Sequence, residues 1–291
     1  MKIFNQNQSF LLRSHLLTKS YIKSQVAAAL NEDLGVLGDI TSQALIEQTQ
    51  VSTANIVLKQ DAVLCGIDFA ISAFMQLDKK ASILSKKADG KFLKKGTIIL
   101  KIKAQTQSIL AAERSALNFL GLMSGIATKA YLFTKIAKPY GVKIYSTRKT
   151  IVGIRALQKY ALTKGGANIN RMTLDDFFFI KDNHVANTSS IIESIAHARA
   201  FYPKKKITVE VDNINQLKEI INEKIDIVLL DNMSAAQIRE CLKLVKGKFK
   251  CEASGNINIT NIKKIAQTKV DRISSGQLTH SVENIDFGLE L

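Results

Sequence analysis

From residue 142 onward, short apolar segments alternate with helical segments, and this alternation limits the possible folds more than any other feature. The segments expected to be strands are Val142–Tyr145, Phe177–Ile180, Ile207–Val211, Ile227–Leu230, Cys251–Ala253 and Arg272–Ser274. Helical patterns lie between them, at Gly153–Thr163, Ser190–Phe201, Ile214–Asn222, Ala235–Leu244 and Ile262–Thr268. This spacing predicts parallel βα units, and their number favours a barrel over a small open sheet.

The first hundred residues carry a different pattern, typical of a mixed α+β module. We expect a helix at Tyr21–Leu34 and a short turn followed by a helix at Val63–Met75. The expected strands are Ser52–Leu58, Ala81–Lys87 and Thr97–Lys103. A long helical pattern follows at Gln107–Lys138, and Gly121 and Gly125 predict a break within it. The sequence therefore predicts an α/β protein whose first part differs in architecture from its second.

Composition narrows the class of protein. The chain has 291 residues, of which 46% are hydrophobic and 23% charged, as in ordinary globular proteins. The net charge of +16 admits nucleic-acid binding, but the lysine pairs are scattered with little aromatic interleaving, which favours a solvated basic surface. The most hydrophobic region, Ile109–Thr128, is interrupted by Glu113, Arg114 and Asn118, so we expect no membrane span.

Three cysteines, Cys65, Cys241 and Cys251, form no CxxC pair. A sparse, odd number of cysteines is typical of free thiols in a reducing compartment, so we expect a cytoplasmic protein without a cysteine-based metal site.

Polar and charged residues follow each expected strand of the second part. The strand ends read STRKT, KDNH, EVDN, LDN, EASG and SSG. The carboxyl ends of barrel strands converge on one mouth, where active sites lie. We therefore expect these side chains to meet there: Arg148, Lys149, Lys181, Asp182, His184, Glu210, Asp231, Ser254 and Ser275. His184 has the alternative role of capping a turn.

The predicted mouth combines cations with two acids, Glu210 and Asp231. These acids can bind sugar hydroxyls or share a magnesium ion with substrate phosphates. The alternative is a structural ring of ion pairs with Lys149 and Lys181. Two Ser-Gly pairs after late strands, Ser254-Gly255 and Ser275-Gly276, are typical of barrel phosphate sites. A phosphorylated sugar together with a carboxylate-bearing partner fits this set.

An ordered series of motifs resembles the quinolinate phosphoribosyltransferase family, the carboxylating nicotinate-nucleotide pyrophosphorylases. The series runs NEDLGVLGDITS, AERSALNFLGLMSGIAT, TRKT, GIRALQKYA, IKDNH, VEVDN, LLDNM, EASGNI and SSGQLTHS, over nearly the whole chain. The resemblance implies an N-terminal α/β sandwich domain, 1–115, and an incomplete barrel of about seven strands, 116–276. The C-terminal tail, 277–291, is expected to join the first domain.

The same resemblance implies the reaction and the partners. Quinolinate and phosphoribosyl pyrophosphate give nicotinate mononucleotide, pyrophosphate and carbon dioxide, with magnesium as cofactor, in NAD biosynthesis. The family further implies a homodimer in which the N-terminal region of one subunit closes the barrel mouth of the other. No nucleic acid or membrane partner is expected.

Site roles implied by the resemblance divide between the two substrates. Arg148, Arg171 and Lys181 are expected to hold the carboxylates of quinolinate, with Arg114 joining them from the partner subunit. Lys149 is expected to contact phosphoribosyl pyrophosphate, and Glu210 and Asp231 its ribose hydroxyls or the magnesium ion. The 5′-phosphate is expected on the two Ser-Gly turns, at Ser254, Gly255, Ser275 and Gly276.

Two residues depart from the family pattern. Val152 stands where the family usually has proline, and Asn170 stands where it usually has a histidine that contacts quinolinate. An amide can donate a hydrogen bond but carries no charge. We therefore expect retained activity with a raised KM for quinolinate, which the kinetics of an Asn170→His variant would decide.

Other functions fit parts of the pattern. A phosphoribosyltransferase-fold protein with a shifted carboxylate substrate is the nearest alternative. A lyase that forms a Schiff base through Lys149 or Lys181 is a second. A basic RNA-binding scaffold is a third, and it predicts binding that weakens steeply with salt.

Overall fold

A computed structural model describes residues 17–291, so the first part of the predicted domain 1–115 lies outside the described range. The chain forms two compact units. The first contains residues 17–131, 156–165 and 282–291, and the second contains residues 132–155 and 166–281. The predicted limit at residue 115 falls inside a continuous helix, α5 (Thr106–Ala137).

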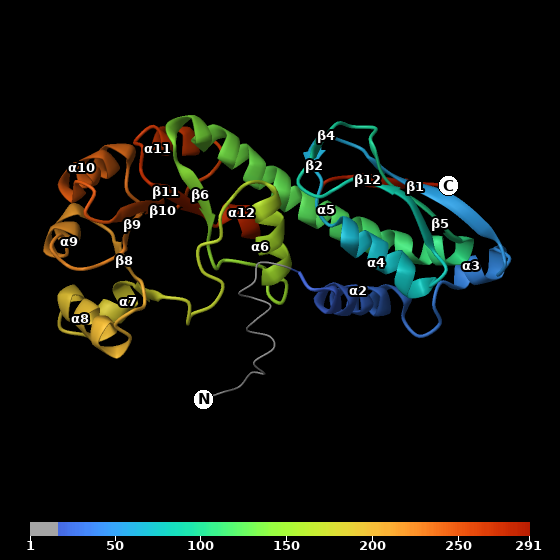
Figure 1. The fold of residues 1–291 in the computed structure, drawn as a ribbon, viewed down its shortest axis with the longest axis horizontal. Helices are drawn as coiled ribbons and strands as arrows, with labels where there is room; N and C mark the ends of the chain where they lie inside the picture. Colours follow the sequence, from blue (N-terminus) through green and yellow to red (C-terminus); the bar gives the residue numbers. More distant parts are fainter. Residues whose placement is uncertain (1–16) are drawn as a thin grey trace. The chain divides into compact units, whose positions relative to one another are not determined.

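The first unit is built on a four-stranded antiparallel sheet with the order β12-β1-β5-β3. Its strands are β1 (Val51–Leu58), β3 (Ser82–Lys86), β5 (Ile98–Gln105) and β12 (Phe287–Glu290), with a separate pair β2 (Ala62–Val63) and β4 (Phe92–Leu93). Its helices are α2 (Lys19–Leu34), α3 (Ile40–Leu45), α4 (Ile67–Leu77), most of α5, and α6 (Arg155–Lys164). The predicted N-terminal α/β architecture is confirmed (Figure 1).

The helix α4 begins at a loop carboxylate rather than at a side chain of its own. Its N-cap, Gly66, has φ +101° and makes no side-chain cap, whereas Asp89 accepts hydrogen bonds from the Gly66 and Ile67 amides at 3.0 and 3.1 Å. The Tyr160 hydroxyl, whose pKa burial raises, donates to the same carboxylate at 3.0 Å. One carboxylate therefore ties α4 and α6 to the turn at residues 88–90.

The predicted break in the long helix is wrong, because α5 is continuous. A Cβ at Gly121 would lie 2.9 Å from the Ile285 carbonyl oxygen, and one at Gly125 would lie 2.1 Å from that of Glu283. The glycines therefore let the C-terminal segment lie directly on the helix. Although α5 is long and apolar enough to cross a membrane, 61% of its most apolar window is buried inside the protein.

The second unit is a six-stranded parallel sheet with the order β6-β11-β10-β9-β8-β7. Its strands are β6 (Lys143–Ser146), β7 (Phe178–Ile180), β8 (Ile207–Val211), β9 (Ile227–Asp231), β10 (Lys250–Ser254) and β11 (Arg272–Ser275). Helices α8 (Ile191–Phe201), α9 (Ile214–Glu219), α10 (Ala235–Val245) and α11 (Ile262–Ala266) cover it, and the short η1 (Lys138–Tyr140), α7 (Asp182–Val185) and α12 (Gln277–His280) complete it.

The predicted count of about seven barrel strands needs a small correction. Beyond β6, a single parallel bridge joins Tyr145 to Asn168, so the seventh element is one residue long rather than a strand. Gly166, with φ +87°, lies two residues before Asn168.

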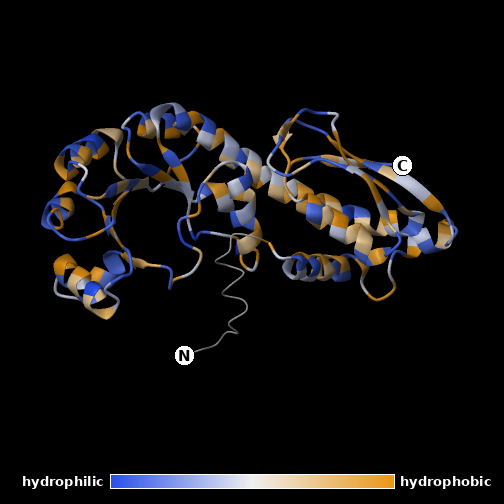
Figure 2. Ribbon diagram, viewed as in Figure 1, coloured by the Kyte–Doolittle hydropathy of each residue, from blue (hydrophilic) through white to orange (hydrophobic). Residues whose placement is uncertain are grey.

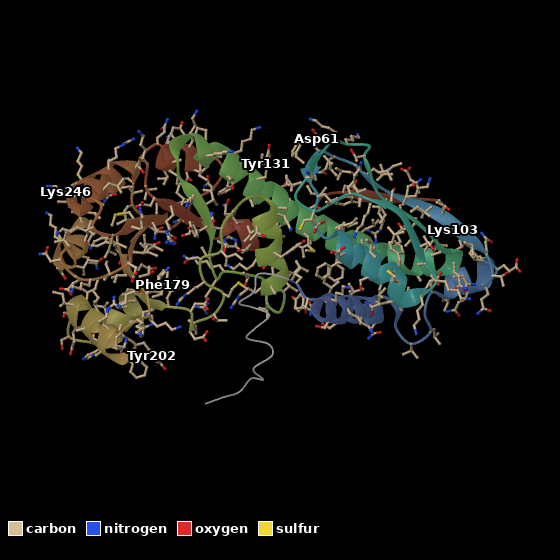
Figure 3. The ribbon with its side chains drawn as sticks, in the orientation of Figure 1. Asp61, Lys103, Tyr131, Phe179, Tyr202 and Lys246 are labelled. Atoms are coloured by element: carbon tan, nitrogen blue, oxygen red, sulfur yellow. The ribbon has the colours of Figure 1, made fainter. Side chains whose placement is uncertain are left out.

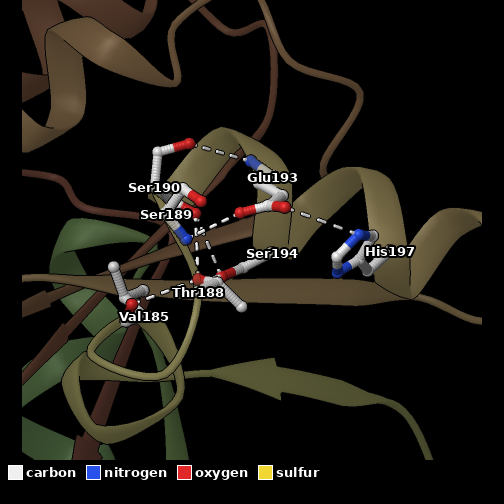
Figure 4. Close-up of polar contacts among 7 residues, drawn as sticks. All are labelled: Val185, Thr188, Ser189, Ser190, Glu193, Ser194 and His197. Atoms are coloured by element: carbon white, nitrogen blue, oxygen red, sulfur yellow. Dashed lines mark hydrogen bonds and ion pairs between the residues drawn. The ribbon is translucent and has the colours of Figure 1, made fainter.

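The helix α8 illustrates how the sequence starts its helices (Figure 4). The Ser190 hydroxyl accepts a hydrogen bond from the Glu193 amide at 3.1 Å, and the Glu193 carboxylate accepts one from the Ser189 amide at 2.6 Å. Thr188 and Ser194 hydroxyls are 2.7 Å apart beside them. These contacts satisfy amides that a helix start leaves without partners, which fixes the loop after β7.

Strand β9 is apolar along its length and polar at its carboxyl end. Ile227 to Leu230 of β9 are buried, and Asp231, the last residue, is partly exposed. Figure 2 shows hydrophobic and hydrophilic residues interleaved on the covering helices, as expected when one face of each packs on the sheet. The core thus holds the strands rigidly while their ends remain open to solvent.

We predict that Asp89→Ala lowers the free energy of unfolding by about 3 kcal/mol, since two amides and a buried hydroxyl lose their acceptor. Asp68→Ala is the control, because Asp68, in the first turn of α4, forms an exposed ion pair with Lys86 and should change stability by less than about 1 kcal/mol. Urea-induced unfolding measures both, and faster hydrogen exchange at Gly66 and Ile67 locates the change. Equal losses in the two variants would contradict the capping role.

Candidate active site

A cavity of about 520 Å³ lies in the second unit at the carboxyl ends of its strands. Eleven of the twelve predicted site residues line it, namely Arg148, Lys149, Asn170, Arg171, Lys181, Glu210, Asp231, Ser254, Gly255, Ser275 and Gly276. The convergence expected from the strand ends therefore exists within one chain. The roles of these residues stay predictions.

Arg114, the twelfth residue, lies elsewhere. It is exposed on α5 in the first unit and does not line the cavity. The sequence predicts that it acts from a partner subunit, and this prediction stays open.

The cations of the cavity crowd one another. Burial and, after it, the like charge of Arg148 lower the pKa of Arg171 to about 10. The Arg148 Nε is buried and, among the described residues, makes no hydrogen bond. The Arg171 guanidinium stacks over Phe179, labelled in Figure 3, at 4.7 Å from the ring centroid. An anion entering the cavity would satisfy donors that the protein itself leaves unmet.

Arg155 supports this cluster from outside the cavity. Its Nε donates to the Thr150 hydroxyl at 3.2 Å and its Nη1 to the Met172 carbonyl at 2.9 Å. These bonds tie the loop after β6 to the segment that carries Arg171. Arg155 thus holds this loop in place from outside the cavity, whereas Val152, at 95% exposure, projects from the loop.

Two carboxylates face the cations. The Lys181 ammonium lies 2.5 Å from Glu210 Oε2, and the Glu210 side chain is 13% exposed. Burial raises the pKa of Glu210, although the bond from Lys181 opposes this. Burial also raises the pKa of Asp231, with Lys181 again opposing and Asp212 adding to the increase. Lys181 and Glu210 therefore form one of the ion pairs that the structural alternative expects. Both residues nevertheless line the cavity.

The loop after β10 packs tightly against the end of β9. Gly255 has φ +87°, and a Cβ there would lie 2.3 Å from Asn232 Oδ1 and 2.7 Å from the Asn232 amide nitrogen. Asn232 donates its amide to the Ser254 carbonyl at 3.0 Å, and Asn256 Nδ2 donates to Asn232 Oδ1 at 3.0 Å. Only glycine fits this crossing, which presents backbone to the cavity as phosphate sites do.

The loop after β11 brings Lys149 and His280 together. A Cβ at Gly276 would lie 2.9 Å from His280 Nε2 and 3.2 Å from Lys149 Cδ. The Thr279 hydroxyl donates to the Lys149 carbonyl at 2.5 Å, which fixes α12 against the loop after β6. Ser275 donates its hydroxyl to the Ile257 carbonyl at 2.6 Å, so its side chain positions the neighbouring loop.

Several lining residues escaped sequence reasoning, notably Glu252, Asn256, Asn258, Phe179 and His280. Glu252 stands two residues before Ser254 on β10, and strand alternation would have pointed it to the same face. His280 lies four residues past Gly276, one helical turn on. His184, by contrast, accepts a hydrogen bond from the Lys181 amide at 3.1 Å and does not line the cavity, so it caps a turn.

Glu210 and Asp231 are the carboxylates expected to bind the predicted magnesium ion. Among residues 17–291, no group of three or more His, Cys, Asp or Glu side chains could hold a metal ion. Glu210 and Asp231 both line the cavity, and after burial the charge of Asp231 adds to the raised pKa of Glu210. Magnesium is commonly held by one or two carboxylates with substrate phosphates and water, and this pair fits that arrangement.

Comparison with protein families gives two matches. The model of the quinolinate phosphoribosyl transferase N-terminal domain matches residues 39–124, and that of the C-terminal domain matches residues 126–290.

Individual proteins resemble the chain over nearly its full length. A probable nicotinate-nucleotide pyrophosphorylase [carboxylating] of Methanocaldococcus jannaschii is 37% identical, covering 94% of this chain and 99% of that protein. The Mycobacterium leprae protein called nicotinate-nucleotide pyrophosphorylase [carboxylating] is 35% identical, covering 92% and 96%. The solved nicotinate-nucleotide pyrophosphorylase of Francisella tularensis aligns with a TM-score of 0.91 at 36% identity, covering 95% and 98%.

We predict that Asp231→Asn stabilises the free protein at neutral pH. Because burial raises the pKa of Asp231, the folded chain binds more protons than the unfolded chain between the ordinary and the raised value. Stability therefore falls as the pH rises through that window, and the variant escapes this fall. Urea unfolding of variant and wild type across the acidic to neutral range measures the difference.

The stability difference should shrink as the pH falls through the window. The exposed Glu240→Gln on α10 is the control and should show no such pH-dependent difference. A variant less stable than wild type at neutral pH would show that Asp231 stabilises the fold instead.

Proposed function

The chain belongs to the quinolinate phosphoribosyltransferase family, and from this premise we propose that it transfers a phosphoribosyl group from phosphoribosyl pyrophosphate to quinolinate. The products are nicotinate mononucleotide, pyrophosphate and carbon dioxide, which places the reaction in NAD biosynthesis. The observation that carries the proposal is the convergence of Arg148, Arg171 and Lys181 with Glu210 and Asp231 in one cavity. A dicarboxylate and a phosphorylated sugar together match both sets of charges.

The dicarboxylate is assigned to the cationic side of the cavity. Arg148 and Arg171 offer planar guanidinium groups, which bind carboxylates with two parallel hydrogen bonds. Arg171 stacks over the Phe179 ring, and its Nη1 donates to the Phe177 carbonyl at 3.5 Å. Asn170 adds an amide donor at the position where the family usually has histidine.

The phosphoribosyl donor is assigned to the loops after the late strands. Ser254 and Gly255 present backbone at the cavity, and Gly276 lies beneath the Lys149 side chain. Lys149 can therefore reach a phosphate held between these loops. A lysine provides a compact charge for phosphate, whereas the guanidinium groups remain with the carboxylates.

The charge distribution suits substitution at the anomeric carbon of the ribose. As the bond to pyrophosphate breaks, the sugar ring gains positive charge, which Glu210 or Asp231 can offset. The pyridine nitrogen of quinolinate forms the new bond at that carbon and becomes quaternary. The carbon–carboxylate bond beside the nitrogen then breaks, its electron pair enters the cationic ring, and a proton replaces carbon dioxide. No protein nucleophile is required.

Three further properties are part of this proposal. Magnesium bound with Glu210, Asp231 and the diphosphate would offset negative charge on the leaving group. A second copy of the chain would add Arg114 to the cavity, which makes the active form a homodimer. The three buried free thiols suit a cytoplasmic location.

The Schiff-base alternative fits the geometry less well. A lysine that attacks a carbonyl needs an uncharged amine. Lys181 forms an ion pair with Glu210, and Lys149 lies over Gly276. Both lysines are therefore placed to bind anions.

We predict that purified protein forms nicotinate mononucleotide from quinolinate only when phosphoribosyl pyrophosphate and magnesium are present. Arg148→Ala should raise the quinolinate KM about 100-fold and Arg148→Lys about 10-fold, because lysine keeps the charge but loses the fork. Lys243→Ala, an exposed change on α10, is the control. Turnover without phosphoribosyl pyrophosphate, or equal quinolinate KM in all variants, would refute the proposal.

The shared site predicts complementation between inactive variants. If Arg114 acts from the partner, a dimer of Arg114→Ala and Arg148→Ala subunits contains one intact site and one doubly defective site. Random mixing makes half of the dimers mixed, so about a quarter of the wild-type activity should return. Steady-state turnover after co-refolding measures it.

A matched pair tests the geometry of that complementation. Arg148→Ala and Lys181→Ala both alter the same cavity, so their mixed dimers contain no intact site and should regain nothing. Recovery in this control, or none in the first mixture, would contradict a partner-supplied Arg114.

A further inference from the structure

Glu252 is a carboxylate sealed inside the second unit beneath the cavity. Its side chain is 0% exposed, yet it lines the cavity. It lies within β10 rather than at the strand end, and its neighbour in the register on β11 is Arg272. A fully buried carboxylate is costly unless it is paired and hydrogen-bonded. Its partners therefore indicate what the position requires.

Three neighbouring strands hold this carboxylate in place. Arg272 Nη1 lies 3.4 Å from Glu252 Oε2, and the Arg272 guanidinium stacks over the Tyr145 ring of β6 at 4.5 Å. Burial raises the pKa of Glu252, whereas Arg272 and the Ser274 hydroxyl lower it. The adjacent guanidinium favours the ionised form, which burial opposes.

The other oxygen reaches Asn170, which carries the link to the ligand. Asn170 Nδ2 donates to Glu252 Oε1 at 3.0 Å. An ionised carboxylate only accepts hydrogen bonds, so it admits one orientation of the amide, with nitrogen toward Glu252. The amide nitrogen carries two hydrogens, and Glu252 takes one. The second is left beside the cavity that both residues line.

We propose that Glu252 is a positioning residue for the dicarboxylate substrate, because it fixes the Asn170 amide so that its second N–H donates to a substrate carboxylate. The inference rests on the proposed function of the cavity. It adds a role that the strand-end pattern does not reveal. Glu252 itself does not contact the reacting atoms, and its effect passes through Asn170.

Glu252→Gln is the central variant, because it keeps shape while removing the acceptor-only character. Glutamine both donates and accepts, so the Asn170 amide is no longer held in one orientation. The quinolinate KM should rise about 5-fold, the effect of one weakened hydrogen bond. The kcat and the KM for phosphoribosyl pyrophosphate should stay within about 2-fold of wild type, because neither depends on Asn170.

A double-mutant cycle separates positioning from a general structural role. Asn170→Ala alone should raise the quinolinate KM about 5- to 10-fold, and adding Glu252→Gln should raise it no further. Glu252→Asp keeps the charge but shortens the side chain, so it should behave like Glu252→Gln. Glu240→Gln on α10 provides the same chemical change at an exposed site and should have no effect.

Each of the following results would contradict one specific claim. Independent effects in the double variant, a changed kcat with an unchanged quinolinate KM, or a normal Asn170→Ala enzyme would overturn the positioning role. The Asn170→Ala result decides even if substitutions at Glu252 prevent folding, which thermal unfolding reveals. If the wild-type chain binds quinolinate in calorimetry but shows no turnover, only the proposed function is contradicted. The double-mutant cycle is then evaluated from quinolinate affinities instead of KM values. A chain that does not bind quinolinate overturns both.

Discussion

The second unit depends on gathering cationic side chains around one cavity, where Lys181 is paired with Glu210. Two like charges about 4 Å apart repel by roughly 4 kcal/mol at an effective dielectric near 20. Burial and, after it, the like charge of Arg148 lower the pKa values of both Arg171 and Arg155, so repulsion contributes in the folded chain. Rigid strands, aromatic stacking on Phe179 and the bonds of Arg155 keep the cluster in place. An anionic ligand relieves the strain, which links the fold to its function.

The acids of the cavity show the same conflict in the opposite sign. Burial raises the pKa values of Glu210, Asp231 and Glu252, so the surroundings of each carboxyl oppose its charged form. Lys181 forms an ion pair with Glu210, and Arg272 forms one with Glu252. The cavity is therefore lined by ion-paired carboxylates and by a donor, Arg148 Nε, that makes no hydrogen bond among the described residues.

Much of this arrangement could be predicted from the sequence, because parallel strands bring their ends together whatever lies between them. That rule placed Arg148, Glu210 and Asp231 correctly in one cavity. Local patterns failed where the deciding contact is distant. Gly125 predicted a break in the helix, but its missing side chain instead leaves room for the segment near Glu283. Glu252 lies inside a strand that looks merely buried, and its pairing with Asn170 depends on the register of the sheet. Arg114 does not line the cavity, and the role predicted for it depends on a second chain.

The central claim is that one cavity binds a dicarboxylate and a phosphoribosyl donor together and couples their chemistry. Quinolinate labelled with ¹³C in the carboxyl group next to the ring nitrogen tests this most directly. The account predicts one labelled carbon dioxide for each pyrophosphate released, and none when phosphoribosyl pyrophosphate is omitted. Labelled carbon dioxide without pyrophosphate, or pyrophosphate without loss of the label, would contradict it.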